Sequence, residues 1–308
     1  MGFDGATLKG IGLMVGAALC FAVMSAMFKI AVEDLSVFEV VFFRGFIGYL
    51  FIVAVERFKP SLRIAGKDRR GLFLRALYGY LSLVLYILVI DHVELGLASA
   101  LNQSSPMFVV LLSYFLLGEH PRLLLPMLVA VAFAGVCLIV SPDLSRLDPY
   151  AALGVLSSVL AAMAYITVRK LRNSDHPWVI VRNFTMWGAL LALPPMLALG
   201  WKWPTPTQWV VVGVSGLAGL FGQFMMTHSY RLAEASVVSP FLYVSVLASF
   251  LFGWFFWSEW PAQGALMGCL LLVGASLAIV ITNSRQPKPG ATTPQSGAPV
   301  VPTGRLNS

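Results

Sequence analysis

The chain has 308 residues, of which 58% are hydrophobic and 11% are charged. Soluble domains carry about 25% charged residues, so this composition excludes a water-soluble globular protein. The net charge of +7 would suit a nucleic-acid partner, but basic residues in short cytoplasmic loops of a membrane protein give the same excess, and we expect no nucleic acid to bind.

Ten apolar runs of about 20 residues follow one another along the chain, and this length spans the hydrocarbon of a bilayer as a helix. The runs cover residues 8–30, 36–55, 70–91, 97–117, 122–140, 150–170, 178–199, 207–230, 236–257 and 263–282. They predict an all-α integral membrane protein with ten transmembrane helices. The tail 283–308 is rich in Pro, Gly, Ser and Thr, and we expect it to be disordered and cytoplasmic.

Lysine and arginine residues indicate the orientation of these helices. With the N-terminus in the cytoplasm, the cytoplasmic side receives the basic segment from Arg57 to Arg75 and most other basic residues. The outer side then receives only Lys29, Arg146 and Lys202. The positive-inside rule favours this topology. We therefore expect a multi-pass protein of the cell inner membrane with both termini in the cytoplasm.

The segment 94–121 recurs 140 positions later as 234–261, without a gap. In this alignment Glu119 meets Glu259, and each glutamate comes two residues before a proline. A fixed offset of this size indicates an internal duplication. A carboxylate just before a helix can cap free backbone amides, and we expect this structural role for both glutamates.

The duplicated unit covers residues 8–140 and again 150–282, and each copy holds five predicted helices. Because five is odd, two tandem copies point in opposite directions across the bilayer. Inverted repeats are typical of secondary transporters, whose site lies near the midplane between the repeats. Two similar halves can exchange conformations at little net cost, so the sequence predicts transport by alternating access.

A channel, a scaffold and a membrane-embedded enzyme are the alternatives to a carrier. An enzyme would need a catalytic constellation, such as paired acids or a His, Asp and Glu metal set, and the sequence contains no such set. We therefore expect no enzyme activity, no cofactor and no metal. No Asp or Glu lies near the middle of a predicted transmembrane helix; Glu39, near the outer end of its helix, comes closest. Because proton and sodium carriers commonly use a buried carboxylate, facilitated diffusion or substrate exchange is favoured over tight ion coupling.

Several motifs resemble the EamA family of the drug/metabolite transporter superfamily. They are SVFEVVFFRG at 36–45, LGE at 117–119, AEAS at 233–236 and WSEWP at 257–261. The resemblance implies ten helices in two inverted repeats around a central cavity, with the fifth and tenth helices peripheral. It also implies transport of small organic metabolites without ATP. The start of the second helix and YRLAEASVVSP at 230–240 look most similar to carriers of S-adenosylmethionine or riboflavin, which implies an amino-acid-, nucleoside- or flavin-like substrate.

Two arginines fall inside predicted helices, where a charge needs a partner or a water-filled cavity. Arg44 lies about eight residues into the run 36–55, and Arg182 lies near the cytoplasmic start of the run 178–199. Both are candidates to bind an anionic group of the substrate or to exchange ion-pair partners during gating. The alternative is a snorkelling arginine or a contact with the carbonyls of a neighbouring helix.

The run 97–117 carries Asn102, Gln103, Ser104 and Ser105 in a row, and the duplication places Tyr243 at the position of Gln103. A substrate between Gln103 and Tyr243 would meet one polar side chain from each half, and hydrogen bonding between helices is the alternative. The other candidates for substrate contact lie near the middle of their helices, and packing is the alternative for each: Tyr78, Tyr80, Tyr165 and Gln223. The expected partners are the lipid bilayer, a small-molecule substrate and, through Gly264 and Gly268, a second copy of the chain.

Overall fold

The computed structural model describes residues 5–105, 107–108, 112, 124–140, 149–171, 174–233 and 238–284. Within these residues the chain is helical and contains no strand. Five helical segments among them are long and apolar enough to cross a membrane: Gly5–Ala31, Val37–Phe58, Arg69–His92, Pro149–Val168 and Pro206–Leu232. The prediction of an all-helical membrane protein is confirmed. Pro106, Glu119, Glu234 and the tail from 285 lie outside the described residues.

The helix boundaries agree with the predicted runs to within a few residues over most of the described chain. The α-helices are α1 (Gly5–Ala31), α2 (Val37–Phe58), α3 (Arg69–His92), α4 (Leu95–Asn102), α6 (Leu124–Val140), α7 (Pro149–Leu171), α8 (Pro177–Ala198), α9 (Pro206–Leu232), α11 (Val244–Trp257) and α12 (Gln263–Ser284). Two short 3-10 helices, η1 (Pro60–Leu62) and η2 (Ser239–Tyr243), precede α3 and α11.

Two predicted runs are not continuous α-helices, which corrects the prediction for 97–117 and 236–257. In the first run α4 ends at Asn102, and the Ser104 hydroxyl donates to the Leu101 carbonyl at 2.6 Å. Such a local side-chain bond competes with the helix. In the second run the 3-10 helix η2, which contains a proline, precedes an α-helix that begins at Val244. The helical geometry therefore changes near position 103 and near its duplicated position, 243.

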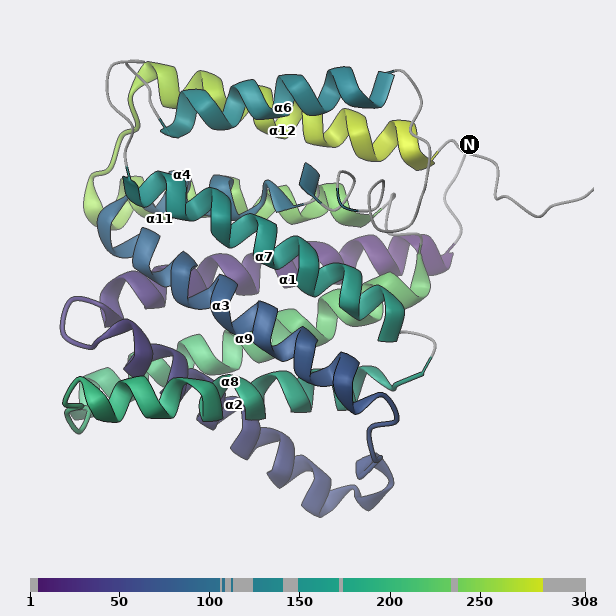
Figure 1. Ribbon diagram of the computed structural model, residues 1–308, viewed down its shortest axis with the longest axis vertical. Helices are drawn as coiled ribbons and strands as arrows, with labels where there is room; N and C mark the ends of the chain where they lie inside the picture. Colours follow the sequence, from purple (N-terminus) through teal and green to yellow (C-terminus); the bar gives the residue numbers. More distant parts are fainter. Residues whose placement is uncertain are drawn as a thin grey trace, which may run out of the picture.

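Helices α6 and α12 pack against each other at one edge of the bundle, the peripheral place expected for the fifth and tenth helices (Figure 1). Their backbones approach closely, because a Cβ added to Gly135 would lie 2.7 Å from the carbonyl oxygen of Gly268. Gly268 therefore packs within its own chain, and the contact with a second copy that we expected through this residue stays a prediction.

The other long helices pack in pairs that join the two copies of the duplication (Figure 1). Helix α1 lies along α9, α2 along α8, and α3 along α7. The largest core cluster is formed by apolar side chains that include Phe28, Ile87, Ile90 and Leu95. The interface between the copies is thus the centre of the protein, which is where a substrate site was expected.

The bundle has two ends, which are named here after Glu259 and Asp175. At the Glu259 end, three contacts join helix termini: Asp34 with Gln208 at 3.1 Å, Glu39 with the Lys202 amide at 2.9 Å, and the stacked rings of His92 and Tyr150 at 3.7 Å. At the Asp175 end, the Asp175 carboxylate accepts from the amides of Lys67 and Asp68 at 2.7 and 3.2 Å. These contacts tie the linker before α8 to the linker before α3.

Candidate functional site

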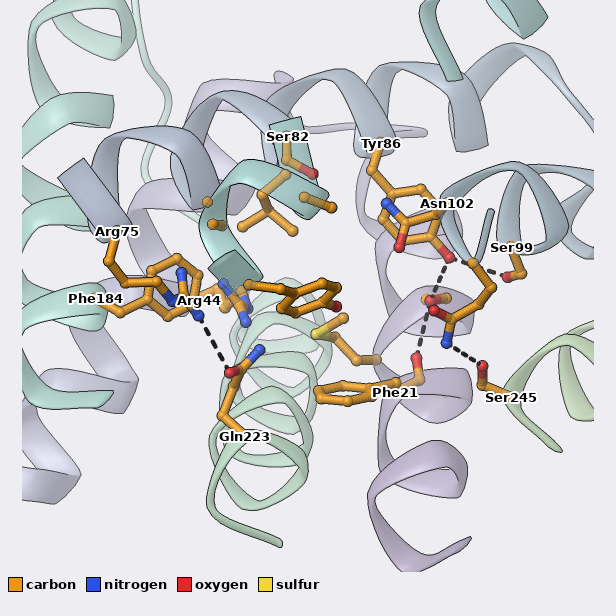
Figure 2. Close-up of a pocket in the computed structure, with 18 residues that line it drawn as sticks. Phe21, Arg44, Arg75, Ser82, Tyr86, Ser99, Asn102, Phe184, Gln223 and Ser245 are labelled. Carbon is orange, nitrogen blue, oxygen red and sulfur yellow. Dashed lines mark hydrogen bonds between the residues drawn. The ribbon is translucent and has the colours of Figure 1, made fainter. Parts of the chain in front are cut away.

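A cavity of about 90 Å³ lies between the helices and is lined by residues of both copies of the duplication (Figure 2). Helices α1, α2, α3 and α4 line it from the first copy, and α7, α8, α9 and α11 line it from the second. Its polar lining residues are Ser25, Arg44, Arg75, Ser82, Tyr86, Ser99, Asn102, Gln103, Tyr165, Gln223 and Ser245. The lining combines two cations with many neutral hydrogen-bonding groups.

Arg44 on α2 and Arg75 on α3 form what we call the arginine pair, and their relative exposures are only 7% and 4%. Both guanidinium groups contact the ring of Phe184 on α8, with distances from Cζ to the ring centroid of 5.5 Å for Arg44 and 4.2 Å for Arg75. Figure 2 shows the two side chains beside this ring at one end of the cavity. The shared aromatic ring attracts both cations and fixes their relative position.

The arginine pair has few polar partners. Arg75 donates to the Gln223 side-chain oxygen at 3.4 Å, and the Nε atoms of both arginines are buried without a hydrogen-bond partner. In the described part of the chain, the three ion pairs involve other cations, namely Lys29, His92 and Arg182. Arginine keeps its proton in proteins, so two positive charges lie together in the bundle without a carboxylate from these residues.

Two glycines make room for the arginine pair. A Cβ added to Gly219 on α9 would lie 2.9 Å from Nη2 of Arg44, and one added to Gly79 on α3 would collide with Nη1 of Arg75. Gly79 and Gly219 are equivalent positions of the duplication, 140 residues apart. Each copy therefore supplies one glycine surface on which one guanidinium group lies.

Four hydroxyl groups form a buried chain across the bundle, called here the hydroxyl chain. The Tyr86 hydroxyl lies 2.8 Å from Ser25 Oγ and 3.0 Å from Ser99 Oγ, and Ser99 Oγ donates to Ser249 Oγ at 2.8 Å. These residues come from α3, α1, α4 and α11, respectively. The chain joins four helices near the cavity and supplies groups that can both donate and accept hydrogen bonds.

The amide side chains at the end of α4 connect the two copies. Gln103 donates to Ser245 Oγ at 2.9 Å and to the Leu242 carbonyl at 3.4 Å, at the point where η2 gives way to α11. Asn102 donates to Ser157 Oγ on α7 at 3.2 Å. In Figure 2 the amide of Asn102 and the hydroxyls of Tyr86, Ser99 and Ser245 lie at the opposite end of the cavity from the arginine pair.

A second layer of contacts lies next to the hydroxyl chain at the Glu259 end and is called the Glu259 network. Glu259 pairs with Lys29 and accepts from the Leu95 amide at 2.9 Å, and its own amide donates to the Gly253 carbonyl at 3.1 Å. Lys29, Leu95 and Gly253 each lie four residues, or about one helical turn, from a serine of the hydroxyl chain. The two layers join α1, α4 and α11 at this end of the bundle.

Glu259 and Arg182 show how the structure resolves two expectations. Glu259 does satisfy a free backbone amide, but it caps the start of α4 rather than the helix that follows it in sequence. Arg182 lies at the Asp175 end, where it donates to Glu56 and to the Ile64 carbonyl, each at 2.8 Å. Arg182 does not line the cavity, so its place in the structure fits the alternative of a contact between neighbouring segments.

The structure brings five of the nine predicted site residues to the cavity: Arg44, Asn102, Gln103, Tyr165 and Gln223. Three others besides Arg182 lie outside its lining. Tyr80 is buried in the largest core cluster, Tyr243 packs in a separate core cluster, and Tyr78 is half-buried on α3. Substrate contact by these three tyrosines stays a prediction.

Sequence reasoning missed Arg75, which we counted among the cytoplasmic basic residues. The structure corrects this placement, because Arg75 is buried and lines the cavity. Its position inside the apolar run 70–91 and one helical turn before Gly79 was the signal that could have identified it. The hydroxyl chain was missed as well, because single serines in apolar helices carry no pattern that separates site residues from helix contacts.

Comparison with known proteins agrees with this architecture. The model of the EamA-like transporter family matches residues 8–141 and again 149–281. The pseudopaline exporter CntI of Pseudomonas aeruginosa strain UCBPP-PA14 is 34% identical over 272 residues, which cover 88% of this chain and 95% of that protein. An S-adenosylmethionine uptake transporter of Rickettsia felis is 21% identical over 278 residues, covering 90% and 94%.

A solved crystal structure shares the fold with a TM-score of 0.58 at 20% identity, over 91% of this chain and 98% of the other. The family model covers most of the sequence in two consecutive matches. The relatives named above are transporters, and their matches to this chain cover nearly their whole length. The chain therefore belongs to the EamA-like transporter family.

Proposed function

We propose that the protein is a secondary transporter that moves a small organic metabolite by alternating access through the cavity. The observation that carries this proposal is a polar cavity, lined by both copies of the duplication, with two layers of contacts joining the helices at its Glu259 end. We infer that these layers close that end in this state. The proposed setting is the cell inner membrane, with both termini in the cytoplasm and the Glu259 end facing outward. The proposed architecture is ten helices in two inverted repeats, 8–140 and 150–282.

The contacts between helix ends support the inverted arrangement. At the Glu259 end of the bundle, α1 and α3 terminate and α2 and α4 begin. The contacts that show this are the pair of Lys29 with Glu259, the bond from the Lys202 amide to Glu39 and the bond from the Leu95 amide to Glu259. The matching helices of the second copy do the reverse there: α7 and α9 begin while α8 and α11 end. These end contacts support the proposed inverted repeat, in which corresponding helices run in opposite directions.

The sequence supplies a counterpart to the Glu259 network at the other end. A shift of 140 positions places Arg169 at the position of Lys29, and Glu119 at that of Glu259. Glu119 and the side chain of Arg169 lie outside what the structure describes. In the proposed cycle, the Lys29 and Glu259 pair joins the helices at the outer end in one state and separates in the other.

The relatives support the substrate class at a coarse level. One is named for export of pseudopaline and another for uptake of S-adenosylmethionine. Small organic molecules carried in either direction therefore fit this fold. For this chain we propose an amino-acid-, nucleoside- or flavin-like metabolite, with S-adenosylmethionine and riboflavin among the compounds to assay, driven by substrate gradients or exchange.

Thiol labelling from each side of the membrane tests the proposal without knowledge of the substrate. Cys20, Cys137 and Cys269 are replaced by serine or alanine, and a reporter is introduced as Ala164→Cys, a buried position in the cavity lining. Right-side-out and inside-out vesicles are treated with a membrane-impermeant methanethiosulfonate. We expect the reporter to react mainly from the cytoplasmic side, because the Glu259 end is closed.

Opening the Glu259 network should reverse this preference. Lys29→Ala is expected to increase labelling from the outer side and to decrease it from the cytoplasmic side. Lys202→Ala, which removes an exposed lysine at the same end of the bundle, is the matched control and should change neither rate. A channel would give equal labelling rates from the two sides, and both rates would rise in Lys29→Ala. A scaffold would give no labelling from either side.

A further inference from the structure

We propose that, among the metabolite classes named above, the cavity selects compounds that carry two negative charges, as carboxylates or as a phosphate ester, and that Arg44 and Arg75 bind these charges. Dicarboxylic amino-acid-like compounds and phosphate esters of nucleoside- or flavin-like compounds would bind, whereas riboflavin and S-adenosylmethionine would not. The proposal rests on the function proposed above, because it takes the cavity as the transport site. The remainder of such a substrate would be uncharged and hydrogen-bonding, and it would face the hydroxyl and amide groups at the other end of the cavity.

The charge of the site carries the first part of the argument. A cation inside a membrane protein is costly unless it is paired or solvated. Here the guanidinium groups of Arg44 and Arg75 both contact the ring of Phe184. The acidic side chains that the structure describes are engaged elsewhere or lie outside the cavity lining: Glu39 at the start of α2, Glu56 with Arg182 and Glu259 with Lys29. A doubly charged anion would compensate both guanidinium groups at once.

The free donors carry the second part. Arg44 and Arg75 are each more than nine-tenths buried, line the cavity and hold an Nε–H group that no described atom accepts. Guanidinium groups match the geometry of carboxylate and phosphate oxygens and bind them through two parallel hydrogen bonds. Gln223 occupies one donor of Arg75 at 3.4 Å, which is a long contact that a substrate oxygen would replace.

The asymmetry of the cavity carries the third part. Phe184 stands at the position that is equivalent to Arg44 in the duplication, so the second copy supplies a ring where the first supplies a cation. The opposite end of the cavity holds the amide of Asn102 and several hydroxyl groups (Figure 2). This gradient from cationic to neutral polar groups would orient an anion and would exclude substrates whose only charges are positive.

Thermal unfolding of the purified full-length protein without ligand gives the first test. Arg44→Met and Arg75→Met each keep an unbranched side chain and remove one buried, uncompensated cation, so each is expected to raise the melting temperature. Arg57→Met, at an exposed position on α2, is the matched control and should leave the melting temperature unchanged. If both cavity variants melt below the wild type, the arginines stabilise the fold and the proposal is overturned.

Ligand-dependent melting gives the second test, with three probes that share a four-carbon skeleton. Succinate carries two negative charges, succinamide is neutral and putrescine carries two positive charges. Glycerol 3-phosphate is added to distinguish a phosphate ester from a dicarboxylate, and acetate and chloride measure the effect of a single charge. We expect succinate or glycerol 3-phosphate to raise the melting temperature saturably, and the other four solutes to have little effect.

The variants connect this binding to the arginine pair. Each Arg→Met variant should weaken the apparent affinity for the active dianion by at least about tenfold, whereas Arg57→Met should leave it unchanged. Arg44→Lys keeps the charge but loses the planar guanidinium group that forms two parallel hydrogen bonds, so this variant should bind with intermediate affinity. Equal stabilisation by succinamide or putrescine, no stabilisation by either dianion, or a shift that persists in both Met variants would contradict the proposal.

This experiment is separate from the test of transport. If the dianions fail while the two-sided labelling behaves as expected, the carrier stands and the substrate class is wrong. If the dianions bind through the arginine pair while the labelling shows no alternation, the binding site stands and the carrier mechanism is wrong.

Discussion

At the scale of single residues, three arginines inside helices have different surroundings. Arg182 lies 2.8 Å from Glu56, a residue 126 positions away in the sequence. Arg44 and Arg75 lie against one phenylalanine, and no ion pair with a described carboxylate compensates them. Residue type and position inside a helix marked both Arg44 and Arg182 as candidates in the sequence. The distance to an acid separates them, and that distance depends on the packing of helices far apart in the chain.

Asp175 provides a residue-scale prediction about pH, because it lies in a linker outside the helices. Burial acts to raise the pKa of this carboxyl, but hydrogen bonds from the Lys67 amide, the Ser174 hydroxyl and the Asp68 amide outweigh it and hold the pKa below its ordinary value. The ionised form therefore stabilises the fold above the ordinary pKa of about 3.9. That stabilisation is lost as the pH falls through the lower pKa of the folded state.

Asp175→Asn should accordingly lower the free energy of unfolding at pH 7 by about 1–3 kcal/mol. The difference in melting temperature from the wild type should stay constant between pH 8 and pH 5 and should shrink below about pH 4. Asp91→Asn changes an exposed acid at the other end of the bundle and serves as the control. A difference that already disappears above pH 5 would contradict the lowered pKa.

At the scale of elements, the apolar runs predicted the positions of most helices but not the breaks after α4 and before α11. Apolar runs of sufficient length predict membrane helices because lipid leaves backbone groups no other partner. The row of polar residues from Asn102 to Ser105 indicated a polar site. Its backbone geometry depends on whether the helical carbonyls bond to backbone amides or to these side chains. In the structure Ser104 bonds to the Leu101 carbonyl and Gln103 bonds to the Leu242 carbonyl. Neither bond can be read from periodicity.

The link that Gln103 makes between the two breaks leads to an element-scale prediction. Gln103→Ala removes hydrogen bonds to Ser245 and to the Leu242 carbonyl, which join α4 of one copy to the start of α11 in the other. We expect at least about a tenfold loss of substrate affinity, because buried polar groups are left unpaired beside the cavity. Membrane insertion should be unaffected.

The measurement is ligand-dependent melting together with uptake into proteoliposomes. Gln208→Ala is the matched control, since it makes the same change at a half-buried cap of α9 outside the cavity. Wild-type affinity in Gln103→Ala would show that this amide serves only to pack helices, which was the alternative reading of its position.

At the scale of the whole molecule, the duplication accounts for the general plan of the protein and not for its chemistry. The offset of 140 residues makes Gly79 and Gly219 equivalent positions, and the structure places an arginine on each. It could not predict that Phe184 would meet both arginines, because the two copies differ in sequence at this position. The positive end of the cavity arises from these differences, whereas the proposed exchange of conformations depends on the shared plan.

The central claim is that the two ends of one bundle open in turn, and distances between spin labels at both ends test it most directly. One pair is placed at Glu33 and Ala262, exposed positions at the Glu259 end, and the other at Asn173 and Arg122, their counterparts 140 residues away in sequence. Lys29→Ala is expected to lengthen the first distance and to shorten the second. If both distances lengthen together, or if the first changes while the second does not, the two ends are not coupled and the alternating-access account is wrong.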